Sequence, residues 1–138
     1  MTERFFLTDT HPLIWYITDQ QSRLTKKVRA AFEQAERGDG SFIWIPAASL
    51  WELSLLLRKT QRFEMVASFE ELVADRFYSK SIAILDLQTE DIMRAHALAF
   101  NKDPFDALIV ATAQRTALPL ITADNEIHDA DICQVYWD

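Results

Sequence analysis

Short runs of bulky apolar residues alternate along this chain with longer segments in which apolar and polar positions are mixed. The short runs are rich in β-branched and aromatic side chains and end at proline or polar residues, which predicts buried strands rather than helices. The predicted strands cover residues 4–8, 42–45, 82–85, 118–122 and 133–136.

In the longer segments, apolar residues recur at every third or fourth position, as they do on the buried face of a helix. Thr25 and Thr89 are predicted N-caps, and the glycine pair at residues 38 and 40 ends the helix that Thr25 opens. The predicted helices cover residues 13–17, 25–38, 47–57, 65–80, 89–100 and 103–116.

Short apolar strands that alternate with helices are typical of a parallel sheet with helices on both faces. The sequence therefore predicts an α/β fold with a single domain, residues 1–138. The expected architecture is a three-layer α/β/α sandwich around a mostly parallel sheet of four to five strands. In such sheets the functional groups lie beyond the carboxyl ends of the strands.

Acidic residues stand at several of these strand ends. Asp9 directly follows the first predicted strand, Glu52 lies early in the helix after the second, and Asp124 follows the fourth. Asp103 and Asp106 begin the helix that precedes the fourth strand. Carboxylates gathered at one edge would repel one another, and a divalent cation would relieve that repulsion. A site made only of oxygen ligands favours Mg²⁺ or Mn²⁺ over zinc or copper.

Most of these acids also have an alternative interpretation as structural residues. Asp103 precedes a proline, as a helix N-cap does, and Glu52 follows Ser49 at the spacing of a capping box. Asp124 is a residue type common in turns. Asp9 has no evident capping role in the sequence. Each alternative is reasonable alone, but four such acids at one edge favour a shared functional site.

Composition and charge narrow the possible functions. The 138 residues carry 14 basic and 21 acidic side chains, so the net charge of −7 opposes nucleic-acid binding unless cations neutralise part of the acid. Two glycines are too few for a P-loop or a dinucleotide fingerprint, and the single cysteine, Cys133, excludes an internal disulfide. With no membrane-spanning run and no signal-peptide pattern at the start, we expect a cytoplasmic protein without a membrane partner.

Four short motifs, in this order along the chain, resemble those of PIN-domain proteins, and in particular the VapC-like toxins of type II toxin–antitoxin systems. They occupy residues 7–11 (LTDTH), 48–53 (ASLWEL), 103–111 (DPFDALIVA) and 120–124 (LITAD). The resemblance spans nearly the whole chain. It implies a Mg²⁺-dependent endoribonuclease that cleaves RNA, a cognate antitoxin that inhibits it, and commonly a homodimer.

The resemblance also implies a set of catalytic acids: Asp9, Glu52, Asp106 and Asp124. The expected metal site comprises Asp9, Asp106 and Asp124, with Asp9 and Asp106 as direct ligands. Asp124 and Glu52 would bind through water, place a second ion, or accept the proton of the attacking water. The metal itself would lower the pKa of water and neutralise charge that develops on the phosphate.

Two supporting residues and two departures complete the comparison with the family. Asp103 is an additional acid, and Thr122 is expected to orient a carboxylate. The VapC-like branch often has arginine where this chain has Ala107, and lysine where it has Leu56. Both departures remove positive charge near the expected site, which bears on RNA affinity and activity more than on metal binding.

Substrate binding would depend on basic residues outside the acid cluster. The candidates are Lys102 and Arg58, with Lys59 and Arg62 as further possibilities. Two other functions stay open at this point. One is a phosphatase or phosphoryl-acceptor domain with Asp9 as its nucleophile. The other is a catalytically weak binding module that keeps the fold, for which Ala107 is the best argument.

Overall fold

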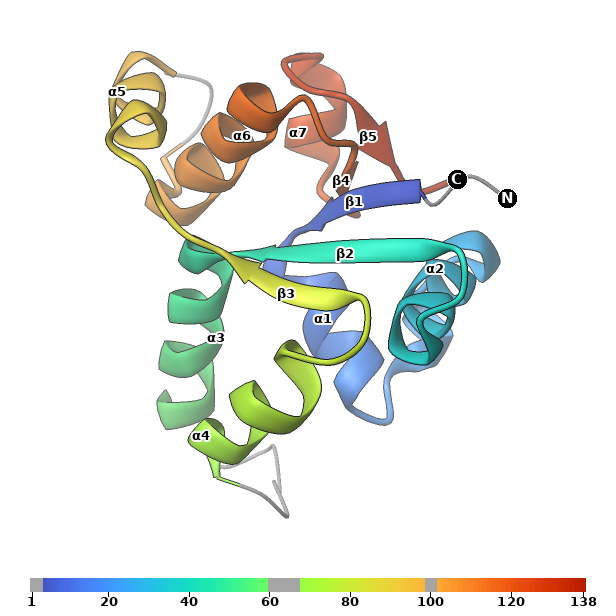
Figure 1. The fold of residues 1–138 in the computed structure, drawn as a ribbon. Coiled ribbons are helices and arrows are strands. Elements are labelled where there is room, and N and C mark those ends of the chain that lie inside the picture. Colours follow the sequence, from blue (N-terminus) through green and yellow to red (C-terminus); the bar gives the residue numbers. More distant parts are fainter. Residues whose placement is uncertain (1–3, 60–67, 99–101) are drawn as a thin grey trace.

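A computed structural model describes residues 4–59, 68–98 and 102–138 of the chain (Figure 1). Five strands form one parallel sheet in the order β3-β2-β1-β4-β5. The strands are β1 (Arg4–Thr8), β2 (Ser41–Pro46), β3 (Ile82–Leu85), β4 (Leu120–Ile121) and β5 (Val135–Tyr136). The prediction of an α/β sandwich with a parallel sheet is confirmed.

Helices cover both faces of the sheet (Figure 1). The first group is α1 (Thr10–Ile17), α2 (Lys26–Arg37), α3 (Ala47–Lys59) and α4 (Phe69–Leu72). The second group is α5 (Thr89–Ala97), α6 (Pro104–Thr116) and α7 (Asn125–Ala130). A 3₁₀ turn, η1 (Gln21–Arg23), precedes α2, and a π-helical turn, η2 (Val73–Phe77), continues α4.

Alternate residues of the strands supply two separate cores. Phe6 of β1 packs with the group of helices that includes α1 and α2, and Leu7 packs on the opposite face with α6 and α7. Both side chains are almost completely buried. This period of two explains why Phe6 and Leu7 are both apolar: successive residues of the strand face helices on opposite sides of the sheet.

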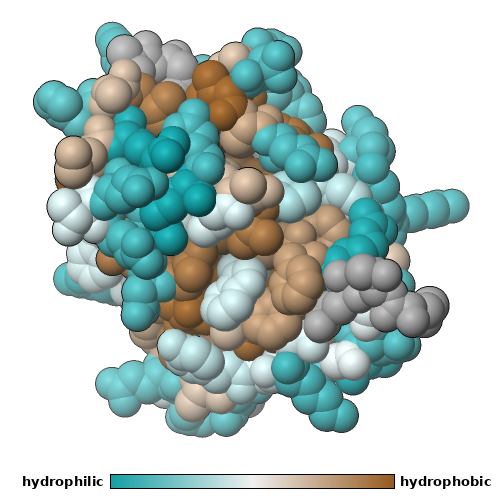
Figure 2. Space-filling view, turned by 45° about the horizontal axis from the view of Figure 1, so that its top comes forward, coloured by the Kyte–Doolittle hydropathy of each residue, from teal (hydrophilic) through white to brown (hydrophobic). Residues whose placement is uncertain are grey.

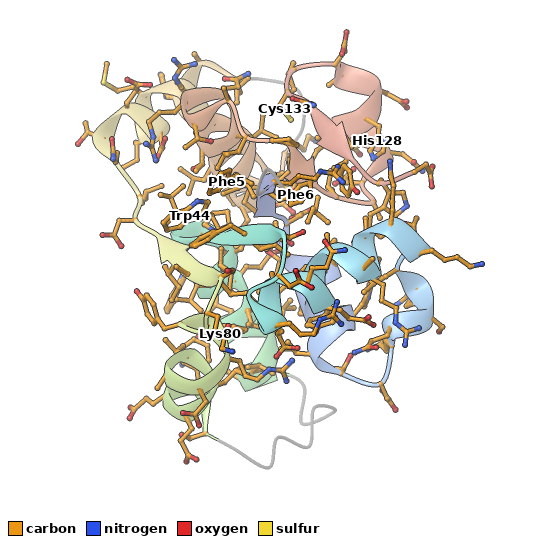
Figure 3. All side chains as sticks on the ribbon, turned by 45° about the vertical axis from the view of Figure 1, so that its right-hand side comes forward. Phe5, Phe6, Trp44, Lys80, His128 and Cys133 are labelled. Atoms are coloured by element: carbon orange, nitrogen blue, oxygen red, sulfur yellow. The ribbon has the colours of Figure 1, made fainter. Side chains whose placement is uncertain are left out.

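Part of the face that carries α5, α6 and α7 remains open to solvent. The rings of Phe5 and Phe42 are 5.9 Å apart, and those of Phe42 and Trp44 are 4.7 Å apart. Phe5 and Trp44 lie on the same side of the sheet (Figure 3), and Phe5 is 46% exposed. Figure 2 shows an apolar area bordered by hydrophilic residues on this side of the molecule.

Helix α2 shows how local sequence sets the ends of an element. The Thr25 hydroxyl accepts a hydrogen bond from Val28 N at 3.3 Å, which confirms the predicted N-cap. Gly38 ends the helix in the left-handed conformation with φ of 71°, which glycine adopts without strain. A single buried stripe, which includes Val28 and Phe32, holds the helix against the sheet.

Several predicted boundaries were wrong, among them those of β4, which covers Leu120–Ile121 rather than residues 118–122. Helix α1 begins at Thr10 rather than residue 13, α5 is capped by Gln88 rather than Thr89, and β5 begins after Cys133. The helix predicted over residues 65–80 is a shorter α4–η2 segment that ends at Phe77, and residues 65–67 lie outside the described part. The predicted end of α5 at residue 100 also lies outside that part, and the described helix stops at Ala97.

Helix α7 was not predicted at all. It has six residues, and Ile127 is the buried residue among them, so no apolar period is visible in its sequence. Asp124 starts this helix as its N-cap and accepts a hydrogen bond from Glu126 N at 2.8 Å. Short helices of this kind depend on their caps and on tertiary contacts more than on periodicity.

Candidate functional site

Asp9 lies where β1 passes into α1, at the carboxyl edge of the sheet. Its carboxylate is 5% exposed and accepts hydrogen bonds from both sides. Thr10 N donates to Oδ1 at 2.7 Å, and the Thr122 hydroxyl donates to Oδ2 at 2.7 Å. Asp9 is also the N-cap of α1, so the interpretation that it has no capping role was wrong.

Thr122 connects the ends of two neighbouring strands. Its hydroxyl donates to Asp9 and accepts from Asp124 N at 3.1 Å, and its side chain is fully buried. His128 of α7 (Figure 3) lies with Nε2 2.9 Å from the Thr122 carbonyl oxygen. These contacts fix the segment between β4 and α7. The Asp124 carboxylate lies close enough to Asp9 to raise the pKa of Asp9.

Glu52 is carried into the same region by α3. The helix begins at Ala47, so Ser49 lies inside it and cannot be its N-cap; the capping-box interpretation of Glu52 was wrong. The Ser49 hydroxyl instead donates to the Thr8 carbonyl oxygen at 3.2 Å and ties α3 to the end of β1. Glu52 is half-buried on the helix and free of any capping duty.

Asp103 and Asp106 occupy the first turn of α6. Asp103 is the predicted N-cap: its Oδ1 accepts hydrogen bonds from Phe105 N at 2.8 Å and Asp106 N at 3.3 Å. Pro104 occupies the first helical position, where its missing N–H costs nothing. Asp103 is exposed and Asp106 is half-buried, so Asp106 is the more enclosed of the two.

The electrostatics of the cluster disfavour its charged form. Burial is the main reason that the pKa of Asp9 is raised, and the nearby Asp124 carboxylate adds to it. Burial also raises the pKa of Glu52, with further contributions from Asp9 and Asp103. His11 acts in the opposite direction and lowers the pKa of both acids. Burial and, to a smaller extent, nearby carboxylates therefore disfavour the charged forms of Asp9 and Glu52.

The raised pKa of Asp9 predicts how Asp9→Asn changes stability in metal-free protein. The folded state binds the proton of Asp9 more tightly than the unfolded chain does, so this carboxyl costs stability as the pH rises from about 4. We expect the melting temperature of Asp9→Asn in EDTA to exceed that of the wild type by an amount that grows between about pH 4 and neutral pH. Asp129→Asn, which changes an exposed acid of α7, is the control. A gain that shrinks with rising pH would contradict the prediction.

The oxygen atoms of the site can be compared with the ligands that Mg²⁺ or Mn²⁺ requires. Among the described residues, no three His, Cys, Asp or Glu side chains stand close enough to enclose an ion. The acids nevertheless present oxygen donors only, and the buried hydroxyl of Thr10 has no hydrogen-bond partner in the described part of the chain. It faces Glu52 closely enough to lower the pKa of that carboxyl, but outside hydrogen-bond geometry. Mg²⁺ retains several waters and needs few direct protein ligands, so these residues fit a hydrated ion.

A cavity of about 500 Å³ opens beside the acids. Glu52 and Asp103 form part of its wall, and apolar side chains from α3 and α6 form much of the rest. The residues around it are Glu52, Leu55, Leu56, Lys59, Lys102, Asp103, Pro104 and Phe105. The cavity is large enough to admit a nucleotide-sized group next to the carboxylates.

The structure separates the predicted basic residues. Lys102 and Lys59 line the cavity, whereas Arg58 is exposed in the last turn of α3 and does not line it. Arg62 lies outside the described residues. Leu56, which replaces the family's lysine, lies in the same wall as the two lysines. Two lysines therefore line the cavity together with Leu56.

Two residues of the site were missed in the sequence. Thr10 and His11 directly follow Asp9, and both influence the acids. His11 affects the two acids through its charge, which requires no metal-ligand spacing. The adjacency to Asp9 was the available signal, since α1 begins at Thr10 and brings both residues to the carboxyl edge.

Comparisons with known proteins agree with this architecture. The chain resembles VapBC2 from Rickettsia felis bound to promoter DNA, with 16% identity, a TM-score of 0.71, and coverage of 97% of this chain and 99% of that chain. It resembles VapBC from Salmonella typhimurium bound to DNA, with 16% identity, a TM-score of 0.66, and coverage of 98% of both chains. It also resembles a toxin–antitoxin complex from Klebsiella pneumoniae, with 19% identity, a TM-score of 0.60, and coverage of 96% of this chain and 99% of that chain. At these identities the likeness establishes the fold. No curated protein matches the sequence.

Family membership rests on a separate comparison. The family model described as PIN domain matches residues 6–132, which is most of the chain and includes all five candidate acids. No helix in the described part has the length and apolar character needed to cross a membrane. With the fold, the acids at the carboxyl edge and the match over residues 6–132 in agreement, the chain belongs to the PIN-domain family.

Proposed function

We propose that this protein is a Mg²⁺-dependent endoribonuclease and the toxin of a type II toxin–antitoxin pair. The observation that carries the proposal is the acid cluster itself. Asp9 is buried with a raised pKa, and Glu52 and Asp124 lie within electrostatic reach of it. Such a cluster is costly to fold unless a cation neutralises it.

In this mechanism the metal-binding acids are Asp9, Asp106 and Asp124. A bound Mg²⁺ would supply charge neutralisation at the phosphate and a lower pKa for water. Thr122 and Thr10 N hold the two oxygens of Asp9 in fixed directions. Glu52 is half-buried with a raised pKa, which suits it to accept the proton of the attacking water.

The cavity beside Glu52 is the proposed place for the RNA next to the cleaved bond. Lys102 and Lys59 provide positive charge for phosphate, and Leu55 and Phe105 provide apolar surface for a sugar or a base. This arrangement keeps the cations at the cavity and the carboxylates at its border. Because Lys59 and Lys102 line the cavity, RNA binding does not require the arginine and lysine that the VapC-like branch often has at the positions of Ala107 and Leu56.

The direct test is cleavage of structured RNAs by the purified protein. We expect cleavage in Mg²⁺ or Mn²⁺ and none in EDTA. A phosphatase would instead release phosphate from monoesters and leave RNA chains intact. A binding module would retain RNA in a gel-shift assay and cut nothing under either condition, which would contradict the proposal.

Metal binding should also stabilise the fold, because a cation relieves the repulsion among the acids. At about 100 times the dissociation constant, Mg²⁺ is expected to add about 2.7 kcal/mol to the free energy of unfolding. Asp9→Asn should lose most of this gain. Thermal melts of both proteins, with Mg²⁺ and with EDTA, measure the difference. A wild-type melting temperature that ignores Mg²⁺ and Mn²⁺ would contradict the metal site.

The proposed partners are a cognate antitoxin and a second copy of the chain. The similar structures from Rickettsia felis, Salmonella typhimurium and Klebsiella pneumoniae are toxin–antitoxin complexes or VapBC assemblies, which supports an antitoxin here. Exposed apolar side chains such as Phe5, Trp51 and Met93 are of the type that anchors protein interfaces.

The homodimer is tested by light scattering on the purified protein. We expect a mass of twice the 16.0 kDa of the chain. Burial of exposed apolar side chains would stabilise the dimer, so it should persist at high salt. A mass of 16.0 kDa at high protein concentration would contradict the dimer without affecting the cleavage chemistry.

A further inference from the structure

A row of aromatic and cationic side chains begins at the acid cluster and continues away from it. We call it the aromatic strip and define it as His11, Trp15, Arg23 and Trp137. The rings of His11 and Trp15 lie 6.2 Å apart on successive turns of α1. The rings of Trp15 and Trp137 are also 6.2 Å apart, in an edge-to-face arrangement. The guanidinium of Arg23 lies over Trp15, 4.7 Å from the ring centroid.

The strip is anchored firmly on the protein and reaches solvent on its outer side. Trp15 and Trp137 are half-buried and pack against the core beneath α1 and α2. The Thr25 hydroxyl donates to the Trp137 carbonyl oxygen at 2.5 Å, which ties the end of the chain to the start of α2. His11 and Arg23 are exposed. Packing alone accounts for the two tryptophans but not for the guanidinium of Arg23 over Trp15.

Further positive charge adjoins the strip at the start of α2. Lys26 and Lys27 occupy its first turn, which contains no acidic residue, although the helix dipole favours acids there. Lys27 Nζ lies 4.4 Å from the centre of the Tyr136 ring. Among the described residues, Arg23, Lys26 and Lys27 form no ion pair with a carboxylate. In a chain of net charge −7, residues 23–27 carry three cations and no acid.

Half-buried aromatic rings, beside cations that have no carboxylate partner in the described part of the chain, are features that bind single-stranded nucleic acid. Bases stack on aromatic rings and on guanidinium planes, and lysines follow the phosphates. Bases paired within a duplex would not be available to such a row. His11 joins the strip to the acids, because it lies in the first turn of α1, two residues after the N-cap Asp9. The strip therefore leads directly to the proposed cleavage centre.

We propose that the aromatic strip binds an unpaired segment of RNA and leads it to the acid cluster, an inference that rests on the proposed ribonuclease function. One base stacks on the Trp15–Arg23 pair. The phosphates of the same segment lie along Lys26 and Lys27.

The test is the affinity for a short labelled oligouridylate, measured by fluorescence anisotropy in EDTA so that no cleavage occurs. Arg23→Ala and Trp15→Leu are each expected to weaken binding about tenfold to a hundredfold. Two matched controls should change it less than twofold. Arg29→Ala removes an arginine of α2 that is paired with Glu33, and Trp51→Leu removes an exposed tryptophan of α3.

The outcomes separate the strip from the chemistry. If Arg23→Ala and Trp15→Leu bind oligouridylate as the wild type does, the strip proposal is wrong, even if the protein cleaves RNA in Mg²⁺. If the wild type binds oligouridylate through the strip but does not cleave RNA in Mg²⁺, the strip proposal is supported and the proposed ribonuclease function is wrong. A strip that binds a protein segment instead would leave RNA affinity unchanged in both variants. Arg23 is exposed, so Arg23→Ala decides the test even if Trp15→Leu fails to fold.

Discussion

Asp106→Asn is expected to remain folded and to lose RNA cleavage by roughly a thousandfold or more, because several kcal/mol of transition-state stabilisation depend on the metal site. Asp103→Asn is expected to be milder in activity and in stability. Asp103 serves as the N-cap of α6, and asparagine caps helices as well as aspartate does. The two acids lie one helical turn apart, so each variant is a matched control for the other.

The comparison requires cleavage rates in Mg²⁺ together with thermal melts of both variants. Loss of a cap would cost about 1 kcal/mol of stability, whereas loss of a metal ligand would reduce the Mg²⁺-induced rise in melting temperature. If Asp103→Asn abolishes cleavage while Asp106→Asn preserves it, the assignment of the metal ligand within the first turn of α6 is reversed.

Arg115→Leu is expected to reduce the free energy of unfolding by about 3–5 kcal/mol, because it leaves a buried carboxylate without its partner. Asp91 of α5 is completely buried, and Arg115 of α6 is 15% exposed. Arg115 Nε donates to Asp91 Oδ1 at 2.5 Å, and Nη2 donates to Oδ2 at 3.2 Å. Gln88 N also donates to Oδ2, at 2.9 Å.

The control for this prediction lies on α5, the helix that carries Asp91. Arg94 pairs with Glu90 at 2.9 Å, but both side chains are about half exposed, so Arg94→Ala should cost less than about 1 kcal/mol. Urea denaturation of both variants measures the difference. Equal losses of unfolding free energy in Arg115→Leu and Arg94→Ala would show that the buried ion pair does not stabilise the packing of α5 against α6.

This pair also matters to the site. Helix α6 carries Asp103 and Asp106 in its first turn and Arg115 in its last. An ion pair at one end of the helix limits its rotation against α5 and so limits where the acids at the other end can lie. A small loss of activity in Arg115→Leu at temperatures where it remains folded would be consistent with this role.

The strands and the larger helices could be predicted because each buries a regular set of apolar residues. Phe6 and Leu7 face opposite cores, so β1 is apolar without alternation, and α2 carries one buried stripe between a threonine cap and a glycine. Helix α7 lacks such a stripe. The start of α1 was missed because the capping role of Asp9 is not evident in the sequence, although its side chain accepts a hydrogen bond from Thr10 N in the structure.

The candidate acids could be predicted from topology, because parallel strands bring their carboxyl ends to one edge. Their surroundings could not. The bond from Thr122 to Asp9 joins residues 113 positions apart in the sequence, and the cavity brings Lys59 of α3 beside Lys102. Such contacts depend on how the layers pack. From the sequence, Arg58 and Lys59 are equally good candidates for substrate binding, and only the orientation of α3 shows that Lys59 lines the cavity.

The central claim is that the acids at this edge hold the catalytic metal, and the position of the ion tests it most directly. A crystal of the protein grown with Mn²⁺ would locate the ion by its anomalous scattering. We predict a peak at about 2.1 Å from carboxylate oxygens of Asp9 and Asp106, with Asp124 and Glu52 reached directly or through water. A saturating Mn²⁺ concentration with no ion at these residues, or with the ion bound elsewhere, would contradict the account.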